Sequence, residues 1–194
     1  GAISLLTLFD DKMKERISRL VLVDSAGIFH KLPDFIDDIT SASPENRIMK
    51  LADEDLLVSI VLKQVFFDPG KIDDEAVKEY SSILRIEKSK ECLYAAAKQI
   101  AIANLRSFHD KVREISVKTL IMWGKEDVII DLIDALKLKS DLKNSELKIL
   151  ENCGHSPQEE MPQETAEILA NFLGVKMEIG ILAKETSAPA GADA

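Results

Sequence analysis

The sequence is poor in cysteine and in long hydrophobic runs. Its 194 residues contain only two cysteines, Cys92 and Cys153. Two cysteines are too few for a disulfide framework and lack the companion ligands of a zinc site, so reduced thiols, a cytoplasmic location and no bound metal are predicted. No window approaches the roughly eighteen apolar residues that cross a bilayer, and the apolar start lacks the basic flank of a signal peptide. Neither a membrane span nor export is predicted.

Positive charge is also scarce, because 25 Lys and Arg residues face 34 Asp and Glu residues, for a net charge of -9. A phosphate-binding surface would have to form against this field, so nucleic acid is not an expected partner. The hydrophobic share of 46% and the charged share of 30% are ordinary for a globular protein. These proportions exclude collagen-like and low-complexity classes and fit one domain.

Three short apolar runs, each closed by polar residues and glycine, indicate β-strands. They span residues 19–24, 118–123 and 146–150 and have the form of strands buried on both faces. Amphipathic helical patterns follow the second and third runs, at residues 131–140 and 163–173. Alternation of strands and helices predicts parallel pairing through right-handed crossovers. The predicted fold class is therefore α/β, with about three parallel strands and flanking helices.

Helical patterns also occupy the start of the chain and the stretch between the first two strands. Apolar residues three and four positions apart predict a helix over residues 2–16. Residues 44–108 form a segment longer than a crossover between two parallel strands requires. The segment contains three helical patterns, at 45–66, 73–84 and 89–108. We interpret them as an inserted helical cap.

The chain is thus predicted to have four parts. Residues 1–43 hold the first helix and strand, and residues 44–108 form the cap. Residues 109–174 form a carboxyl-terminal core with the remaining two strands. Residues 175–194 are a tail of small residues with nothing to bury, for which disorder is predicted.

The loops that follow the three predicted strands are the expected location of a site, because open parallel sheets bind ligands at the carboxyl ends of their strands. The first loop contains Asp24 and Ser25, the second Asp127 and the third His155. An acid after one strand and a histidine after the next is an arrangement in which a carboxylate orients an imidazole, which then takes a proton from a nucleophile. In a fold with this order, the nucleophile comes earlier in the chain.

Longer motifs around these residues resemble the α/β-hydrolase superfamily. Gly124-Lys-Glu-Asp127 after a Leu-Ile-Met-Trp run, and Cys-Gly-His155-Ser-Pro-Gln-Glu-Glu-Met-Pro before the last helix, resemble its acid and histidine segments. Leu20-Val-Leu-Val-Asp-Ser-Ala-Gly27 is similar to its sixth strand. Val65-Phe-Phe-Asp-Pro-Gly-Lys-Ile-Asp-Asp-Glu75 is similar to cap helices of its esterase, lipase and carbon–carbon hydrolase branches. The resemblance covers residues 1–174.

The resemblance implies that His155 is the general base of a catalytic triad and that Asp127 is its acid. Asp131 and Asp24 are the alternatives for the acid, since an acid after the sixth strand also occurs in this fold. Gly1 is similar to the last glycine of the Gly-x-Ser-x-Gly nucleophile elbow. The resemblance therefore implies that the nucleophile lies about two or three residues before Gly1 and that this chain is the carboxyl-terminal portion of the hydrolase.

Other candidates are predicted to have structural roles. Ser25 and Ser156 lack the Gly-x-Ser-x-Gly frame, so loop capping is expected of them. Cys153 lies two residues before His155, and that spacing in a tight turn disfavours a Cys–His dyad. Surface positions are predicted for two histidines and core positions for four aromatic residues: His30 and His109 at the surface, and Trp123, Phe66, Phe67 and Phe108 in the core.

The function implied by the resemblance is hydrolysis of a carboxylic ester with a small apolar acyl or alcohol part, without a cofactor or metal. Carbon–carbon, epoxide or haloalkane hydrolysis stays open, because the nucleophile, Ser or Asp, separates these reactions. A non-catalytic fragment that binds a small apolar ligand, an incomplete gene product and a cleavage product also stay open.

The predicted strand at residues 19–24 would, in that fold, have a neighbour that precedes Gly1. Without it, the uncharged middle of the strand forms an uncovered edge. The chain by itself is therefore predicted to be inactive, and to aggregate, to self-associate as a dimer through that edge, or to be stable only with the missing half.

Overall fold

A parallel three-stranded sheet is the centre of the computed structural model, which describes residues 1–26, 53–102 and 105–176. Its strands are β1 (Arg19–Val23), β2 (Lys118–Gly124) and β3 (Ser145–Leu150). They lie in the order β1-β2-β3, and both pairs are parallel. The predicted α/β class and the three predicted strands are confirmed.

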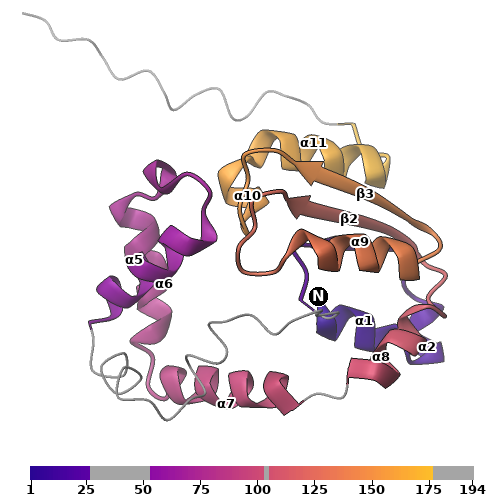
Figure 1. Ribbon diagram of the computed structural model, residues 1–194, viewed down its shortest axis with the longest axis horizontal. Coiled ribbons are helices and arrows are strands. Elements are labelled where there is room, and N and C mark those ends of the chain that lie inside the picture. The colour runs from indigo at the N-terminus through magenta and orange to yellow at the C-terminus, as the bar shows by residue number, and fades with distance from the viewer. Residues whose placement is uncertain (27–52, 103–104, 177–194) are drawn as a thin grey trace, which may run out of the picture.

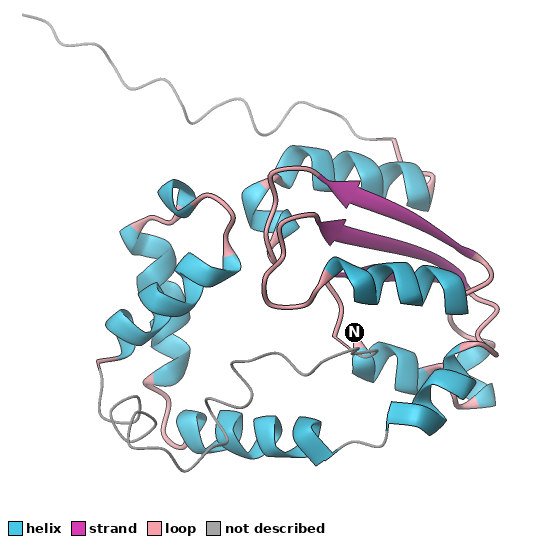
Figure 2. Cartoon of the chain, in the orientation of Figure 1, coloured by secondary structure: helices cyan, strands magenta, loops and turns pink. Residues whose placement is uncertain are grey.

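Helices cover both faces of the sheet (Figures 1 and 2). Alternate residues of β2 point to opposite faces, with Ile121 in one core cluster and Met122 in the other. Both side chains are fully buried, as expected for a strand covered on two sides. The covering helices are α1 (Ala2–Thr7), α8 (Leu105–Val112) and α9 (Leu132–Asp141) on one face, and α11 (Pro162–Leu173) on the other.

The strand β3 differs from the prediction that all three strands are buried on both faces. Lys148 and Ile149 are exposed, although Leu150 at its end is buried. Within the described residues β3 pairs only with β2, so it is an edge strand of this sheet. An edge strand has a neighbour on one side only, which explains the lower burial.

The start of the chain does not form the single helix predicted over residues 2–16. Helix α1 ends at Thr7, and a second short helix, α2 (Asp11–Lys14), follows. The Asp10 carboxylate accepts hydrogen bonds from the backbone N–H groups of Lys12, at 2.8 Å, and Met13, at 3.2 Å. An aspartate in this role is a strong helix N-cap. The local cap therefore restarts the helix.

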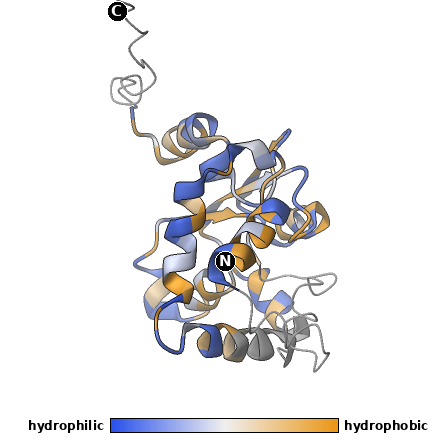
Figure 3. Cartoon of the chain, turned by 90° about the vertical axis from the view of Figure 1, so that its left-hand side faces the viewer, coloured by the Kyte–Doolittle hydropathy of each residue, from blue (hydrophilic) through white to orange (hydrophobic). Residues whose placement is uncertain are grey.

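Between β1 and β2 the structure describes a helical segment made of α5, η1, α6, α7 and α8. Part of the predicted first pattern, residues 45–52, lies outside the described residues, as do 103–104. Seen from the side of α5 and α6, hydrophilic and hydrophobic residues alternate around single helices (Figure 3). The bounds are α5 (Glu54–Val65), η1 (Pro69–Lys71), α6 (Asp74–Leu84) and α7 (Ser89–Ile102).

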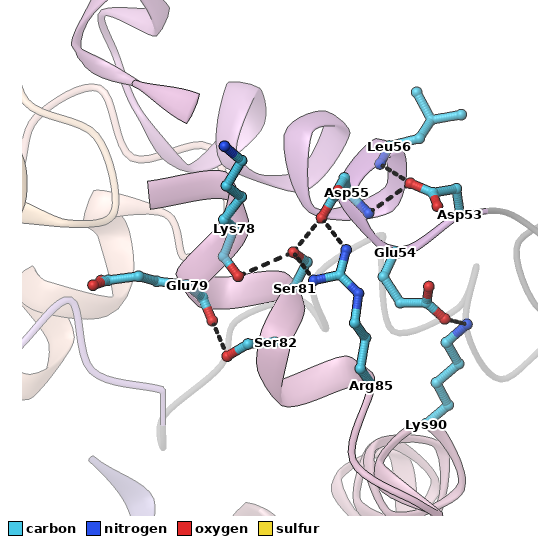
Figure 4. Close-up of polar contacts among 10 residues, drawn as sticks. All are labelled: Asp53, Glu54, Asp55, Leu56, Lys78, Glu79, Ser81, Ser82, Arg85 and Lys90. Carbon is cyan, nitrogen blue, oxygen red and sulfur yellow. Dashed lines mark hydrogen bonds and ion pairs between the residues drawn. The ribbon is translucent and has the colours of Figure 1, made fainter. Parts of the chain in front are cut away.

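Polar contacts join these helices to one another (Figure 4). The Asp55 carboxylate on α5 accepts hydrogen bonds from the Ser81 hydroxyl and the Arg85 guanidinium. Lys90 on α7 forms an ion pair of 2.6 Å with Glu54 on α5. A small apolar cluster, which includes the buried Leu62, joins α5 and α6. The segment thus has internal contacts of its own.

The tail predicted to be disordered lies almost entirely outside the described residues, which end at Lys176. His30 lies outside them as well. None of the helices in the described ranges is both long and apolar enough to cross a membrane.

Candidate active site

The loops that follow β2 and β3 lie against each other. A Cβ atom added to Gly124 would lie 1.9 Å from the carbonyl oxygen of Gly154, so only glycine fits at this crossing. The backbone N–H of Glu126 donates a hydrogen bond of 3.0 Å to the carbonyl oxygen of Cys153. These contacts bring Asp127 and His155 together at the carboxyl end of the sheet.

Asp127 and His155 form a hydrogen-bonded pair. The imidazole Nδ1 lies 2.8 Å from Oδ2 of Asp127. The side chain of Asp127 is 0% exposed, whereas that of His155 is 27% exposed. The other oxygen, Oδ1, accepts hydrogen bonds from the backbone N–H groups of Ile129, at 2.8 Å, and Ile130, at 3.0 Å. These two backbone N–H groups fix the Asp127 carboxylate in position against the imidazole.

This geometry determines the tautomer of the neutral imidazole. An ionised carboxylate only accepts hydrogen bonds, so Nδ1 of His155 carries the hydrogen and donates it to Asp127. Nε2 is then the unprotonated nitrogen. A histidine held in this way can accept a proton at Nε2 while the carboxylate stabilises the resulting imidazolium.

Asp24 lies next to this pair but is not hydrogen-bonded to His155. Its Oδ1 accepts a hydrogen bond of 2.8 Å from the backbone N–H of Gly124. Its Oδ2 is buried and has no hydrogen-bond partner among the described residues. The pKa of Asp24 is raised to about 8, mainly by burial and also by the negative charge of Asp127, against the opposing effect of the hydrogen bond from Gly124. Asp24 is thus a buried acid that holds its proton near neutral pH.

The backbone at Asp24 is also unusual. Its φ is 39°, in the left-handed region that few non-glycine residues adopt. The two residues that follow, Ser25 and Ala26, lie against Gly1. Such local strain is found most often where a site requires it.

Asp24, Asp127 and His155 offer ligand atoms within 4.8 Å of one another. Both oxygens of Asp127 and the Nδ1 of His155 are already used in hydrogen bonds. Asp24 favours its neutral form, which is a poor metal ligand. The three side chains fit a hydrogen-bonded acid–histidine site better than a metal site.

The other proposed acid and the two serines have different surroundings. Asp131 caps α9, where its Oδ1 accepts a hydrogen bond of 2.8 Å from the backbone N–H of Ile133. Ser25 is buried and donates a hydrogen bond of 3.3 Å to the carbonyl oxygen of Ala26. Ser156 stands at the N-cap position of α10 (Pro157–Glu160), but its side chain makes no capping hydrogen bond. The capping prediction holds for the position of Ser156 and not for its hydroxyl.

Cys153 is buried, in agreement with a structural role. Burial, together with the nearby Glu160 carboxylate, raises the pKa of its thiol to about 12. A cysteine nucleophile reacts as the thiolate, which this site disfavours.

Two structural predictions are wrong. His109 is not a surface residue without a partner, because its Nδ1 lies 3.4 Å from Oδ2 of the buried Asp141. Phe67, expected in the core, is 46% exposed. The other aromatic residues agree better: Trp123 and Phe66 are buried, and Phe108 contacts Phe9 edge-on with centroids 5.4 Å apart.

Glu160 is a residue for which the sequence predicts no role. Its carboxylate is buried and accepts hydrogen bonds from the backbone N–H groups of Gly154 and Phe67. Charged residues are rarely buried without partners, but a Glu-Glu pair before a helix does not indicate which of the two faces inward. Only the tertiary contacts show that Glu160 is the one that faces inward.

A parallel sheet with helices on both faces, and an acid–histidine pair at the carboxyl ends of neighbouring strands, defines a hydrolase class in which a nucleophile, a histidine and an acid act together. The chain belongs to the alpha/beta hydrolase fold family, whose model matches residues 1–162.

Similar proteins include a monoacylglycerol lipase and a semialdehyde hydrolase. The chain is 42% identical over 67 residues to the monoacylglycerol lipase ABHD6 of Mus musculus, covering 34% of this chain and 20% of that protein. It is 28% identical over 163 residues to the 2-hydroxymuconate semialdehyde hydrolase of Pseudomonas sp. (strain CF600), covering 82% of this chain and 54% of that protein. The matched part thus spans about half or less of these relatives.

Solved structures share the fold. The meta-cleavage product hydrolase CumD of Pseudomonas fluorescens IP01 has a TM-score of 0.73 and 18% identity, over 90% of this chain and 61% of that one. A putative lipase of Acinetobacter baumannii AYE has a TM-score of 0.68 and 28% identity, over 89% of this chain and 57% of that one. At 18% identity, the first likeness shows the fold alone.

Proposed function

We propose that this chain is part of a carboxylic ester hydrolase that acts on small apolar esters. The observation that carries the proposal is the hydrogen bond of 2.8 Å between His155 and the fully buried Asp127. The lipases among the similar proteins support an ester substrate. We assign the general base to His155 and the orienting acid to Asp127.

In the proposed mechanism, Nε2 of His155 removes the proton from the nucleophile as it attacks the ester carbonyl. The histidine then returns the proton to the leaving alcohol, and in the second half of the reaction it activates water. Asp127 holds the tautomer and stabilises the imidazolium. General base catalysis of this kind contributes about 10²- to 10⁴-fold to the rate.

We propose that the nucleophile precedes Gly1 in the full-length protein. Gly1 supports this placement because a Cβ atom on it would lie 1.6 Å from Oγ of Ser25. Ser25 directly follows Asp24, so residues just before Gly1 start from the same end of the sheet as the acid–histidine pair. A position with no room for a Cβ atom also agrees with the last glycine of a Gly-x-Ser-x-Gly elbow.

Carbon–carbon bond hydrolysis is the second candidate function. The likeness to the 2-hydroxymuconate semialdehyde hydrolase favours it, since that match covers 82% of this chain. The same acid and histidine serve both reactions. Parallel assays of the full-length protein with a short-chain chromogenic ester and with a vinylogous diketone separate the two.

The experiment that tests the proposal compares the full-length protein with the 194-residue chain alone. We expect the full-length protein to hydrolyse a chromogenic ester and the chain alone to be inactive. We also expect the chain alone to elute as a dimer or an aggregate in size-exclusion chromatography, because within the described residues one edge of β1 is unpaired. If the chain alone were an active, monodisperse monomer, both the expected inactivity and the expected self-association would be wrong. Ser25 would then be the candidate nucleophile.

We further propose that residues 44–108, which include α5, α6 and α7, are a cap over the site and select the substrate. Replacing this segment in the full-length protein by that of a relative is expected to shift the preferred acyl chain length and to leave the dependence on His155 intact. Rates for a series of esters measure the shift. A folded exchange with an unchanged profile would place selectivity outside this segment.

A further inference from the structure

Glu160 is the last residue of α10, and its side chain connects two distant parts of the chain. The residue is 4% exposed. Its Oε2 accepts a hydrogen bond of 2.7 Å from the backbone N–H of Phe67, in the connection between α5 and η1. Its Oε1 accepts a hydrogen bond of 2.8 Å from the backbone N–H of Gly154, the residue before His155. Each carboxylate oxygen therefore binds a backbone donor from a different segment.

Further contacts join the same two segments. The backbone N–H of His155 donates a hydrogen bond of 2.7 Å to the carbonyl oxygen of Val65, at the end of α5. A Cβ atom on Gly154 would lie 2.3 Å from that same oxygen. Lys71 in η1 donates a hydrogen bond of 2.7 Å from Nζ to the carbonyl oxygen of Glu160. The chain that leaves α5 thus lies directly on the loop that carries His155.

We propose that Glu160 is a positioning residue that fastens the α5–α6 part of the cap to the histidine loop and so holds the His155 imidazole against Asp127. The inference rests on the proposed function, because it gives His155 a catalytic role. It adds that the α5–α6 part of the cap and the loop that carries His155 move together. A displacement of the α5–η1 connection has to break the bonds of Glu160 or carry the histidine loop with it.

The chemistry of the site favours glutamate over the similar residues. Both oxygens of Glu160 face backbone N–H donors, so both positions have to accept. Glutamine has one accepting oxygen, and its amide NH₂ would face an N–H group in the other position. Aspartate is shorter by one methylene group, so its carboxylate would not reach the position that the Glu160 carboxylate occupies between the two donors. Charge-assisted bonds from backbone N–H groups to a buried carboxylate are also stronger than neutral ones.

The test uses the full-length protein with Glu160→Gln and, as the matched control, Glu164→Gln. Glu164 is exposed in the first turn of α11 and undergoes the same chemical change. We expect Glu160→Gln to raise the hydrogen-exchange rates of the Phe67 and Gly154 amides at least about tenfold. We expect it to lower kcat for the ester by about ten- to a hundredfold, since small displacements of a catalytic group are costly. Glu164→Gln should leave both unchanged.

A spectroscopic measurement separates positioning from a purely structural role. The Nδ1 proton of His155, held against Asp127, is expected to give a protected, downfield NMR resonance. In Glu160→Gln this resonance should broaden or disappear at temperatures well below unfolding. If the amides lose protection but the resonance and kcat stay as in the control, Glu160 stabilises the fold without positioning His155, and the proposal is wrong.

Two further outcomes keep the inference distinct from the proposed function. If Glu160→Gln does not fold, hydrogen exchange of the unsubstituted protein still tests the connection, because the Phe67 and Gly154 amides should then exchange with the same opening free energy. Clearly different opening free energies would overturn the proposal. If His155→Ala keeps full activity, the proposed function fails, whereas the exchange result still decides whether Glu160 joins the two segments.

Discussion

Replacing His155 by alanine in the full-length protein is expected to lower ester turnover by about 10⁴-fold or more, because the nucleophile loses its base. Asp127→Asn is expected to be severe but less complete. Oδ1 of Asp127 is held by the backbone N–H groups of Ile129 and Ile130, so the asparagine oxygen has to take that place. Its NH₂ group then faces Nδ1 of His155, and Nε2 becomes protonated. A protonated Nε2 cannot remove the proton of the nucleophile.

The control for these substitutions is Asp131→Asn, which makes the same chemical change at the exposed N-cap of α9. It should cost stability of about 1 kcal/mol or less and leave the rate nearly unchanged. Steady-state kinetics of the three variants measure the difference. If His155→Ala keeps a tenth of the activity, or if Asp131→Asn or Asp24→Asn costs more than Asp127→Asn, the assignment of base and acid is wrong.

The sheet and the acid–histidine pair could be predicted from sequence because their signals are local. Each strand is a short apolar run closed by polar residues, and parallel strands place the following loops at one edge. Asp127 and His155 follow β2 and β3 directly, and β2 and β3 are neighbours in the sheet. Adjacent strands therefore sufficed to predict that the two side chains meet.

The remaining features depend on contacts that a local pattern does not contain. The periodicity of residues 2–16 continues through Asp10, but α1 has already ended at Thr7, and the carboxylate of Asp10 begins a second helix. His109 is half-buried, and its ring lies beside Asp141 at the end of α9. Glu160 faces inward because two backbone N–H groups from distant segments meet there. For His109 and Glu160, tertiary structure decides what the residue does.

Asp24 shows the same limit at the site itself. The sequence places an acid after the first strand, and this made Asp24 an alternative partner of His155. In the structure its position beside Asp127 has a different consequence, because two carboxyl groups share a buried region and repel as anions. Burial, with this repulsion, raises the pKa of Asp24 to about 8, so that its carboxyl group holds a proton near neutral pH.

The last prediction follows from this pKa and concerns stability. In the unfolded chain Asp24 ionises near its ordinary value of 3.8, whereas in the folded protein it does so near 8. Between these pH values the folded state binds one more proton than the unfolded state, so the free energy of unfolding falls as pH rises through this window and levels off above it. An asparagine at this position cannot ionise, so its contribution to the free energy of unfolding does not fall as pH rises. Its oxygen can accept from Gly124, and its NH₂ can donate toward Asp127.

We therefore expect Asp24→Asn to be about as stable as the unsubstituted protein at pH 4 and more stable at pH 8, by on the order of 2 to 4 kcal/mol. Asp141→Asn is the matched control, because Asp141 is also buried but accepts a hydrogen bond of 2.8 Å from Nε of Arg113. Asp141→Asn removes the negative charge that pairs with the Arg113 guanidinium and should destabilise the protein. Thermal unfolding of the three full-length proteins between pH 4 and 9 measures both effects. A stability difference for Asp24→Asn that does not grow with pH would mean that Asp24 is ionised in the fold, and its buried Oδ2 would then need a proton donor from outside the described residues.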